Sequence, residues 1–234
     1  MRTTSGVAVD DLTARARIRD AAIEAFASRG FDATVREIAS RAGVSPGLIT
    51  HHFGSKDALR EACDAEALRR VLEIKLDGVR RSPSEQVGMI AELDEFGPTF
   101  GYVLRSVRDG GEAGRAFLRN MIDDALIYTA EAVESGRLLP SIDPAGRVEL
   151  LVTQSIGGML MQLTLAGDVD FSDGAALIRQ ISGSTSLVLL ELYTQGLLAD
   201  RSVFDEYLRQ VHPSAAHPTP AQQNRTTQQN RTAQ

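Results

Sequence analysis

The segment from Ser45 to Ser55 carries polar side chains that can hydrogen-bond to nucleic acid. These side chains are small, hydroxyl-bearing or imidazole groups, and no acidic residue stands among them. Because it lacks carboxylates, such a face can approach phosphates and base edges closely. An ordinary exposed helix would carry Lys, Glu and Gln instead. The residues that this pattern predicts to contact DNA are Ser45, Pro46, Gly47, Thr50, His51 and His52.

The two adjacent histidines could instead bind a metal ion. Neighbouring residues on a helix point about 100° apart, and no Cys or Asp ligand set accompanies His51 and His52. The sequence therefore favours DNA contact over metal binding, and we expect neither a metal nor another cofactor.

A rigid scaffold must position these residues, and the sequence TVREIASRAGVSPGLITHHFGSK at 34–56 predicts a helix-turn-helix. Thr34 and Glu37 match a capping box at the start of the first helix. Gly43 follows that helix where a left-handed residue is needed, and a Ser-Pro pair then starts the second helix. Such a second helix is built to lie in the DNA major groove. Its predicted inward face is Leu48, Ile49 and Phe53.

Residues 12–60 resemble the N-terminal part of the TetR (tetracycline-repressor) family of bacterial transcriptional regulators. The resemblance rests on the run ARIRDAAIEAFASRGF, the core T-V-R-E-I-A-x-x-A-G-V-S and the junction H-H-F-G-S-K-D-A-L. Where the family commonly has a Tyr shortly before the Phe, this chain has Thr50 and His52. A hydroxyl or an imidazole would therefore replace the aromatic phosphate contact of the family.

The resemblance implies a homodimer that presents two such helices, roughly 34–36 Å apart, to a pseudo-palindromic operator. It also implies that Thr34 and Lys56 contact phosphate. Arg36, at the start of the first motif helix, is the candidate for a guanine edge, because a guanidinium can bond O6 and N7 together. Since such regulators are usually released from DNA by a small ligand, the resemblance further implies a small-molecule effector and repression as the output.

Charge separates the chain into two parts. Residues 1–60 hold nine Lys and Arg against seven Asp and Glu, whereas residues 61–210 hold 14 against 24. A weakly basic head on an acidic body, with an overall pI near 5.3, fits a protein that touches DNA at one end only. One Cys, no apolar run of membrane-spanning length and no signal peptide predict a cytoplasmic protein that does not enter a membrane.

Beyond the motif, the apolar residues follow helical spacing and nothing alternates with the period of a strand. We predict an all-α fold, in which a three-helix DNA-binding head precedes a larger C-terminal helical bundle for dimerisation and ligand binding. The tail is rich in Pro, Gln, Asn and Thr and contains QQNRT twice, a composition typical of disorder. The predicted divisions are a disordered N-terminus at 1–10, the head at 11–57, the body at 58–210 and a disordered tail at 211–234.

Two longer helices are expected to support the motif. The first should begin near Asp11 or Thr13 and end at Gly30. The other should open at Ser55 and run for about twenty residues, or roughly 30 Å, so that it joins head and body without a flexible linker. Its apolar stripe contains Cys63, which we therefore expect to be a buried, inert thiol.

Two late helices, at about 147–166 and 173–198, are apolar around most of their circumference and contain small residues at mid-length. A helix that is apolar nearly all round must be covered on every side, and a body of this size has few elements for that. We predict that the two helices pair with their copies across a two-fold axis, as the resemblance also implies. The alternative is that they are ordinary core helices of a monomer.

The effector pocket that the resemblance implies should lie in the body. Its candidate lining residues could equally be plain core. Asp123 and Asp124 would favour a cationic ligand if they faced inward, although an acidic pair is more typical of a solvated surface. The candidates are Phe96, Phe100, Met121, Ala125, Tyr128 and Met159.

Two other classes of protein compete with this interpretation. An enzyme is disfavoured because the chain contains no P-loop, G-x-G-x-x-G or H-E-x-x-H motif. An architectural or adaptor protein would use the helix-turn-helix without a small-molecule effector, and it would show weak, salt-dominated DNA binding without sequence preference.

Overall fold

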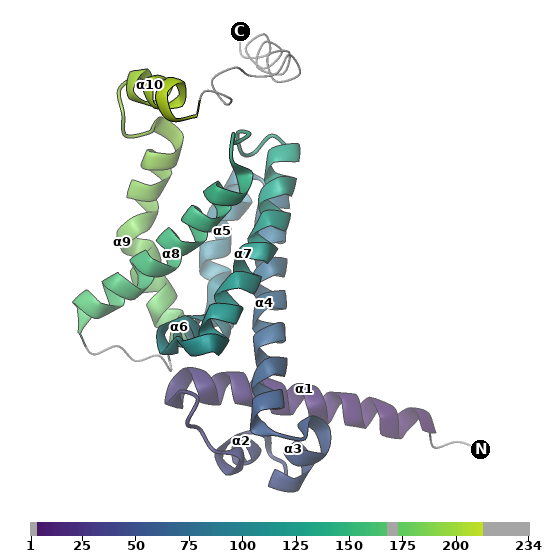
Figure 1. The fold of residues 1–234 in the computed structure, drawn as a ribbon. Coiled ribbons are helices and arrows are strands. Elements are labelled where there is room, and N and C mark those ends of the chain that lie inside the picture. Colours follow the sequence, from purple (N-terminus) through teal and green to yellow (C-terminus); the bar gives the residue numbers. More distant parts are fainter. Residues whose placement is uncertain (1–3, 168–172, 213–234) are drawn as a thin grey trace. The chain divides into compact units, whose positions relative to one another are not determined.

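The computed structural model describes the backbone of residues 4–167 and 173–212, and their side chains except at 4–11, 90–94 and 184. Every element in these ranges is helical, which confirms the predicted all-α fold (Figure 1). The elements are α1 (Thr4–Arg29), α2 (Val35–Ala42), α3 (Pro46–Phe53), α4 (Lys56–Arg80), α5 (Pro83–Glu92), the 3-10 helix η1 (Leu93–Phe96), α6 (Gly97–Asp109), α7 (Gly111–Glu134), α8 (Pro144–Ala166), α9 (Gly174–Gln195) and α10 (Ser202–Val211).

The chain forms two compact units, residues 1–184 and 185–234. The first unit contains α1 to α8 and the start of α9, and the second contains the rest of α9 and α10. The division between head and body at residues 57 and 58 stays a prediction. The disordered tail was predicted for 211–234; Val211 is the last residue of α10, and residues 213–234 lie outside the described residues.

The helix-turn-helix forms as the sequence predicts. The Thr34 Oγ1 accepts a hydrogen bond from the Glu37 amide at 3.2 Å, and the Glu37 carboxylate accepts one from the Thr34 amide at 2.7 Å. Gly43 ends α2 in the left-handed region, with φ 65° and ψ 37°, where a side chain would be strained. Ser45 is the N-cap of α3 through its backbone, because its side chain makes no capping hydrogen bond.

The core of the head is shared by its three helices and the start of α4, and it is continuous with buried residues of α6, α7 and α8. The spacing of the apolar residues turns one face of each helix toward the others, and burial of each large side chain contributes about 1.5–3 kcal/mol. The fully or nearly fully buried members are Ile18, Ala22, Phe26, Ile38, Ala39, Ile49, Phe53 and Leu59.

The structure corrects the predicted start of the first helix. α1 begins at Thr4, not at Asp11 or Thr13, and so continues through residues 4–10, which were predicted to be disordered. No proline interrupts this stretch, and the glycine at position 6 costs a helix only about 1 kcal/mol. The two capping signals are therefore overridden. Residues 1–3 lie outside the described residues.

α4 joins the motif to the bundle. It is 25 residues long, or about 37 Å at the helical rise. It contacts α1 and α3 of the head as well as α6 and α7 (Figure 1). Ser55 caps it by accepting a hydrogen bond from the Ala58 amide at 3.0 Å. Cys63 is fully buried, as predicted, and its thiol donates to the Arg19 carbonyl at 3.6 Å.

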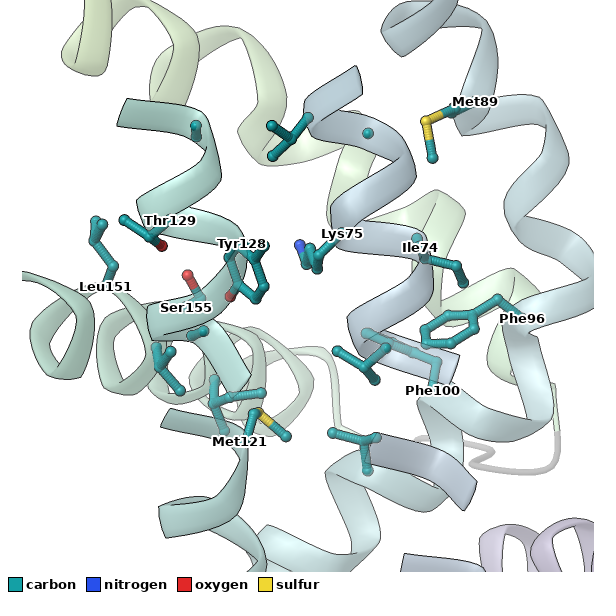
Figure 2. A pocket seen from close by; sticks show the side chains of 18 of the residues that line it. Ile74, Lys75, Met89, Phe96, Phe100, Met121, Tyr128, Thr129, Leu151 and Ser155 are labelled. Atoms are coloured by element: carbon teal, nitrogen blue, oxygen red, sulfur yellow. The ribbon is translucent and has the colours of Figure 1, made fainter. Parts of the chain in front are cut away.

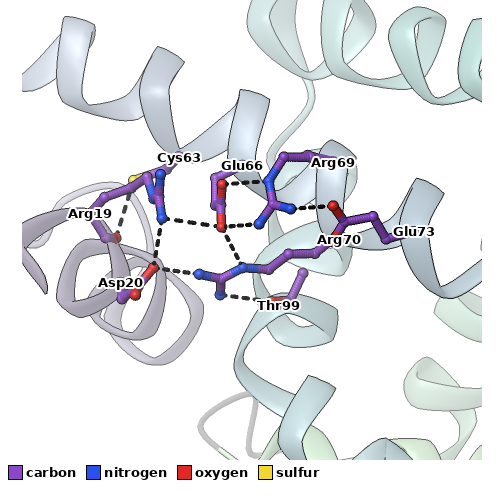
Figure 3. A network of polar contacts seen from close by, with 8 residues as sticks. All are labelled: Arg19, Asp20, Cys63, Glu66, Arg69, Arg70, Glu73 and Thr99. Atoms are coloured by element: carbon purple, nitrogen blue, oxygen red, sulfur yellow. Dashed lines mark hydrogen bonds and ion pairs between the residues drawn. The ribbon is translucent and has the colours of Figure 1, made fainter. Parts of the chain in front are cut away.

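An ionic network ties α4 to α1 and α6 (Figure 3). Glu66 is its centre: this buried carboxylate accepts hydrogen bonds from Arg69 and Arg70, at distances of 2.7–3.0 Å, and lies 3.1 Å from an Arg19 nitrogen. Arg70 continues the network to Asp20 on α1 and, at 3.4 Å, to the Thr99 hydroxyl on α6. Hydrogen bonds from Arg69 and Arg70, with the charge of Arg19, hold the pKa of Glu66 at about 2.

Candidate nucleic-acid interface and ligand cavity

α3 separates an inward apolar face from an outward polar face. Ile49 and Phe53 are buried in the head core, and Leu48 is half-buried against it. Thr50 and His51 are exposed. The polar groups of α3 are thus held by a helix whose other side is fixed by packing, which is the arrangement that reading a DNA groove requires.

The turn that precedes α3 is open to solvent. Ser45, Pro46 and Gly47 are exposed, and a Cβ built on Gly47 would meet only the Ser45 hydroxyl, at 4.0 Å. The N-terminal end of α3 is therefore uncovered, and backbone N–H groups at a helix start can donate to phosphate.

His52 is less available than the sequence suggests. The side chain is half-buried, and its Nε2 atom is covered. Its ring lies against the neighbouring rings, with centroids 5.4 Å from His51 and 6.3 Å from Phe53. The residue directly precedes buried Phe53, so it stands at the edge of the inward face rather than on the outward one.

The three predicted contacts outside this segment lie in two places. Thr34 and Lys56 lie near each other around Glu37, whose pKa is lowered by hydrogen bonds with Thr34 and further by the charges of Arg29 and Lys56. Thr34 is exposed and Lys56 is half-exposed. Arg36 is exposed in the first turn of α2 and makes no hydrogen bond or ion pair with a described residue.

The residues Gly43 to Gly47, GVSPG, also match the letters G-x-S-x-G of a hydrolase nucleophile elbow. That motif requires a turn from a strand into a helix. Here Ser45 lies between α2 and α3, and the described ranges contain no strand. The match is therefore one of letters only, and the serine belongs to the turn of the helix-turn-helix.

A cavity of about 850 Å³ lies between α4, α5, η1, α6, α7, α8 and the first part of α9 (Figure 2). This volume is within the range of small-molecule sites. The six side chains named from the sequence all line it: Phe96, Phe100, Met121, Ala125, Tyr128 and Met159. Asp123 is exposed, and neither it nor Asp124 lines the cavity.

Sequence reasoning missed the charged and polar members of this lining. Lys75 on α4, Arg137 after α7 and Ser155 on α8 all border the cavity. A signal for Lys75 was present, because it follows Val71 by four residues and so continues the apolar stripe of α4 with a cation. Burial lowers the pKa of Lys75 and raises that of Tyr128.

α8 exposes apolar side chains on its surface away from the bundle. Leu150, Met161 and Leu165 are 62%, 67% and 82% exposed, and Gly157 and Gly158 face open space. By length and composition α8 passes the test for a membrane span, as no other helix in the described ranges does; only 17% of its apolar stretch is buried. In the second unit, α9 likewise exposes apolar side chains: Leu187, Val188, Leu190 and Tyr193.

Comparisons with known proteins place this arrangement among bacterial regulators. Residues 18–63 match the model of bacterial regulatory proteins of the tetR family, and residues 94–199 match a tetracyclin repressor-like C-terminal domain. The chain is 38% identical over 208 residues to the HTH-type transcriptional regulatory protein RaaS of Mycobacterium tuberculosis, covering 88% of this chain and 97% of that protein.

Two further similarities agree. The HTH-type transcriptional regulator BetI of Escherichia coli is 31% identical over 140 residues, which are 58% of this chain and 69% of BetI. A solved structure described as the molecular basis for control of antibiotic production by bacterial hormones superposes with a TM-score of 0.52 at 25% identity, covering 78% of this chain and 96% of that one.

Proposed function

Because the chain belongs to the TetR family of bacterial transcriptional regulators, we propose that it is a ligand-responsive repressor that binds a pseudo-palindromic operator as a homodimer in the cytoplasm. The observation that carries the DNA-binding part is the two-sided character of α3. Its apolar side is packed into the head core, and its exposed side offers hydroxyl and imidazole groups without a carboxylate.

The proposed DNA contacts follow from exposure and chemistry. Arg36 is exposed and has no described partner, so its guanidinium is free to bond a guanine edge. Thr34 and Lys56 contact phosphate, the Lys56 ammonium through charge and the Thr34 hydroxyl as a donor. The remaining base and phosphate contacts are divided among Ser45, Pro46, Gly47, Thr50 and His51, with His52 at their edge.

The proposed dimer uses α8 and α9, the helices predicted to pair with their copies across a two-fold axis. Exposed apolar side chains on both helices support this, as do Gly157 and Gly158, which leave room for a second helix to approach closely. Packing α8 against its copy would also cover the exposed apolar surface of a helix that is long and apolar enough to span a membrane. Two heads on one dimer would then meet successive major grooves, roughly 34–36 Å apart.

The cavity is the proposed effector site, and α4 is the proposed connection to DNA. α4 lines the cavity with Val71, Ile74 and Lys75, and the same helix contacts α1 and α3 of the head. A ligand can release the operator only if it binds the DNA-incompetent arrangement more tightly than the competent one. One matched structure is described in terms of control by bacterial hormones, which supports a chemical signal as the effector of this chain.

Genome-wide occupancy mapping of the tagged protein tests the proposal. We expect a small number of sites that share one inverted-repeat sequence, upstream of genes whose transcription rises when the gene for this protein is deleted. The alternative, an architectural or adaptor protein without an effector, predicts diffuse occupancy without a shared sequence, together with binding that weakens steeply with salt. Diffuse occupancy would therefore remove the proposed function.

A further inference from the structure

We propose that the cavity binds an anionic amphiphile, a molecule with one carboxylate-type head and an extended apolar body, and that Lys75 holds the head. This inference rests on the proposed role of the cavity as the effector site. It names the chemical class of that effector, which the family alone does not supply.

The first argument is the sign of the charge inside the cavity. Among the described side chains that line it, none is acidic and two, Lys75 and Arg137, are cationic. This contrasts with residues 61–210 as a whole, where 24 acidic residues outnumber 14 basic ones. The acidic side chains that the structure describes in this region lie outside the lining, so the described lining is positively charged.

The second argument is the situation of Lys75. Figure 2 shows its side chain extending from α4 into the cavity, on the side where Tyr128 enters from α7. The side chain is exposed, so a small molecule in the cavity can reach it. The protein atoms around the ammonium group lower its pKa by partial desolvation. Lys75 makes no hydrogen bond or ion pair with a described side chain. A ligand anion beside this ammonium group would supply the counter-charge that no described residue provides.

Arg137 does not share this situation. It lies near Glu85, whose pKa is lowered by hydrogen bonds from Ser82 and further by the charges of Arg81 and Arg137. Its charge thus already has an acidic neighbour. Lys75 is therefore the cation in the cavity that lacks a described counter-charge.

The rest of the lining fits the two ends of an amphiphile. Tyr128, Thr129 and Ser155 place hydroxyl groups on the α7 and α8 side of the cavity, across from Lys75 (Figure 2). Burial, together with the charge of Asp124, raises the pKa of Tyr128, so its phenol stays protonated and can donate to a carboxylate. The apolar remainder can enclose a chain, and its methionines adapt to irregular shapes: Met89, Phe96, Phe100, Met121, Met159 and Ile178.

Calorimetric titration of the full-length protein tests the charge requirement. The probes are the straight-chain carboxylates from octanoate to hexadecanoate, with 1-dodecanol as the uncharged analogue and dodecyltrimethylammonium as the cationic one, all below their micelle concentrations. We expect at least one carboxylate to bind saturably, about tenfold or more tightly than the alcohol, because a charge-assisted hydrogen bond strengthens binding by at least that factor. Equal affinity for carboxylate and alcohol, preference for the ammonium, or no saturable carboxylate binding across the series contradicts the proposal.

Matched variants locate the anion within the cavity. Lys75→Met keeps the length of the side chain and should weaken carboxylate binding about tenfold or more while leaving 1-dodecanol binding unchanged. Lys75→Arg should retain carboxylate preference, and Arg137→Met should change carboxylate affinity by less than about threefold. Melting curves confirm that each variant is folded, and Lys75→Met should melt no lower than wild type. Unchanged carboxylate affinity in Lys75→Met overturns the assignment.

A parallel operator-binding assay separates this inference from the proposed function. If carboxylates bind through Lys75 but leave operator affinity unchanged, the ligand class stands and the ligand-controlled part of the proposed function fails. If the operator is released by another ligand while no carboxylate binds, the proposed function stands and the ligand class fails.

Discussion

At the scale of single residues, some polar side chains of the head cap helices or form ion pairs, whereas others remain exposed and can contact DNA. The Thr34 hydroxyl and the Glu37 carboxylate cap α2, and Arg41 lies 3.0 Å from Glu24. Arg36, by contrast, is exposed and without a described partner. Because no described residue pairs with this guanidinium, its removal is the cleanest test of DNA recognition.

Arg36→Ala should lower operator affinity by about 10- to 100-fold and relax the preference at one base position, because it removes a bidentate contact to a guanine edge. Titration of labelled duplexes, each changed at one position, measures both effects. Arg115→Ala removes the same charge from an exposed site on α7 and should change neither. Loss of affinity without loss of base preference would reassign Arg36 to a phosphate contact.

Glu66 gives a prediction about pH. Its pKa is about 2 in the folded protein, against an ordinary value of 4.5, so the folded state favours the ionised form. The stability that Glu66 contributes is therefore fully present above pH 4.5 and is lost as the pH falls from 4.5 toward 2. Urea unfolding of wild type should show this loss across that window.

Glu66→Gln should cost about 2–3 kcal/mol at neutral pH, since Arg19, Arg69 and Arg70 lose their buried counter-charge. It should also flatten the pH dependence of stability below 4.5. Glu73→Gln removes a carboxylate that is 60% exposed and should cost less than about 1 kcal/mol. Equal costs for the two substitutions would refute the central place of Glu66 in the network.

At the scale of elements, close helix contact depends on glycine at one crossing. A Cβ on Gly174, at the start of α9, would lie 1.9 Å from the Gly97 carbonyl oxygen on α6. That atom belongs to the backbone, so the two helices would have to separate. Gly174→Ala should therefore lower stability by about 1–3 kcal/mol.

Gly88 on α5 is the control for this substitution. Nothing lies within 4 Å of a Cβ built there, so Gly88→Ala should stabilise its helix by up to about 1 kcal/mol. Differential scanning calorimetry of the two variants and wild type measures both effects. If Gly174→Ala has the same melting temperature as wild type, close contact between Gly174 and the Gly97 carbonyl does not require glycine at position 174.

The elements also show where sequence reasoning succeeds. The helix-turn-helix was predictable because its signals are local: the Thr34 and Glu37 cap, the left-handed Gly43 and the Ser-Pro start all act within a few residues. The start of α1 was not, because isolated capping residues cannot stop a helix that nothing else interrupts. Likewise, the polar run around His52 predicts that its side chain points outward. Whether the neighbouring rings cover it depends on packing, which the sequence does not show.

The cavity shows the same limit at longer range. The resemblance implied a pocket, and the six side chains named for it, on η1, α6, α7 and α8, do line one space. Helical periodicity does not tell a filled core from an empty one, since that depends on how the helices are spaced. The lysine on the inward stripe of α4 was the one local sign that this interior is not plain core.

At the scale of the whole molecule, the exposed apolar surface of α8 predicts a dimer. Light scattering should give a mass of twice the 25.3 kDa chain. Met161→Arg, at a side chain that is 67% exposed on α8, should shift the protein toward monomer and weaken operator binding, because a charge would be buried at the interface.

Val87→Arg is the matched control, since Val87 on α5 has the same exposed fraction of 67%. It should leave the mass and the operator affinity unchanged. A dimer that persists in Met161→Arg, or dissociates equally in Val87→Arg, would remove α8 from the interface.

Selection from a random duplex pool by the purified full-length protein tests sequence-specific DNA recognition by paired α3 helices most directly. The account predicts one enriched inverted repeat, with half-sites centred about 10–10.5 base pairs or a multiple of that apart, and loss of one preferred base in the Arg36→Ala selection. A final pool indistinguishable from the starting pool, at a salt concentration where the protein still binds DNA, would contradict it.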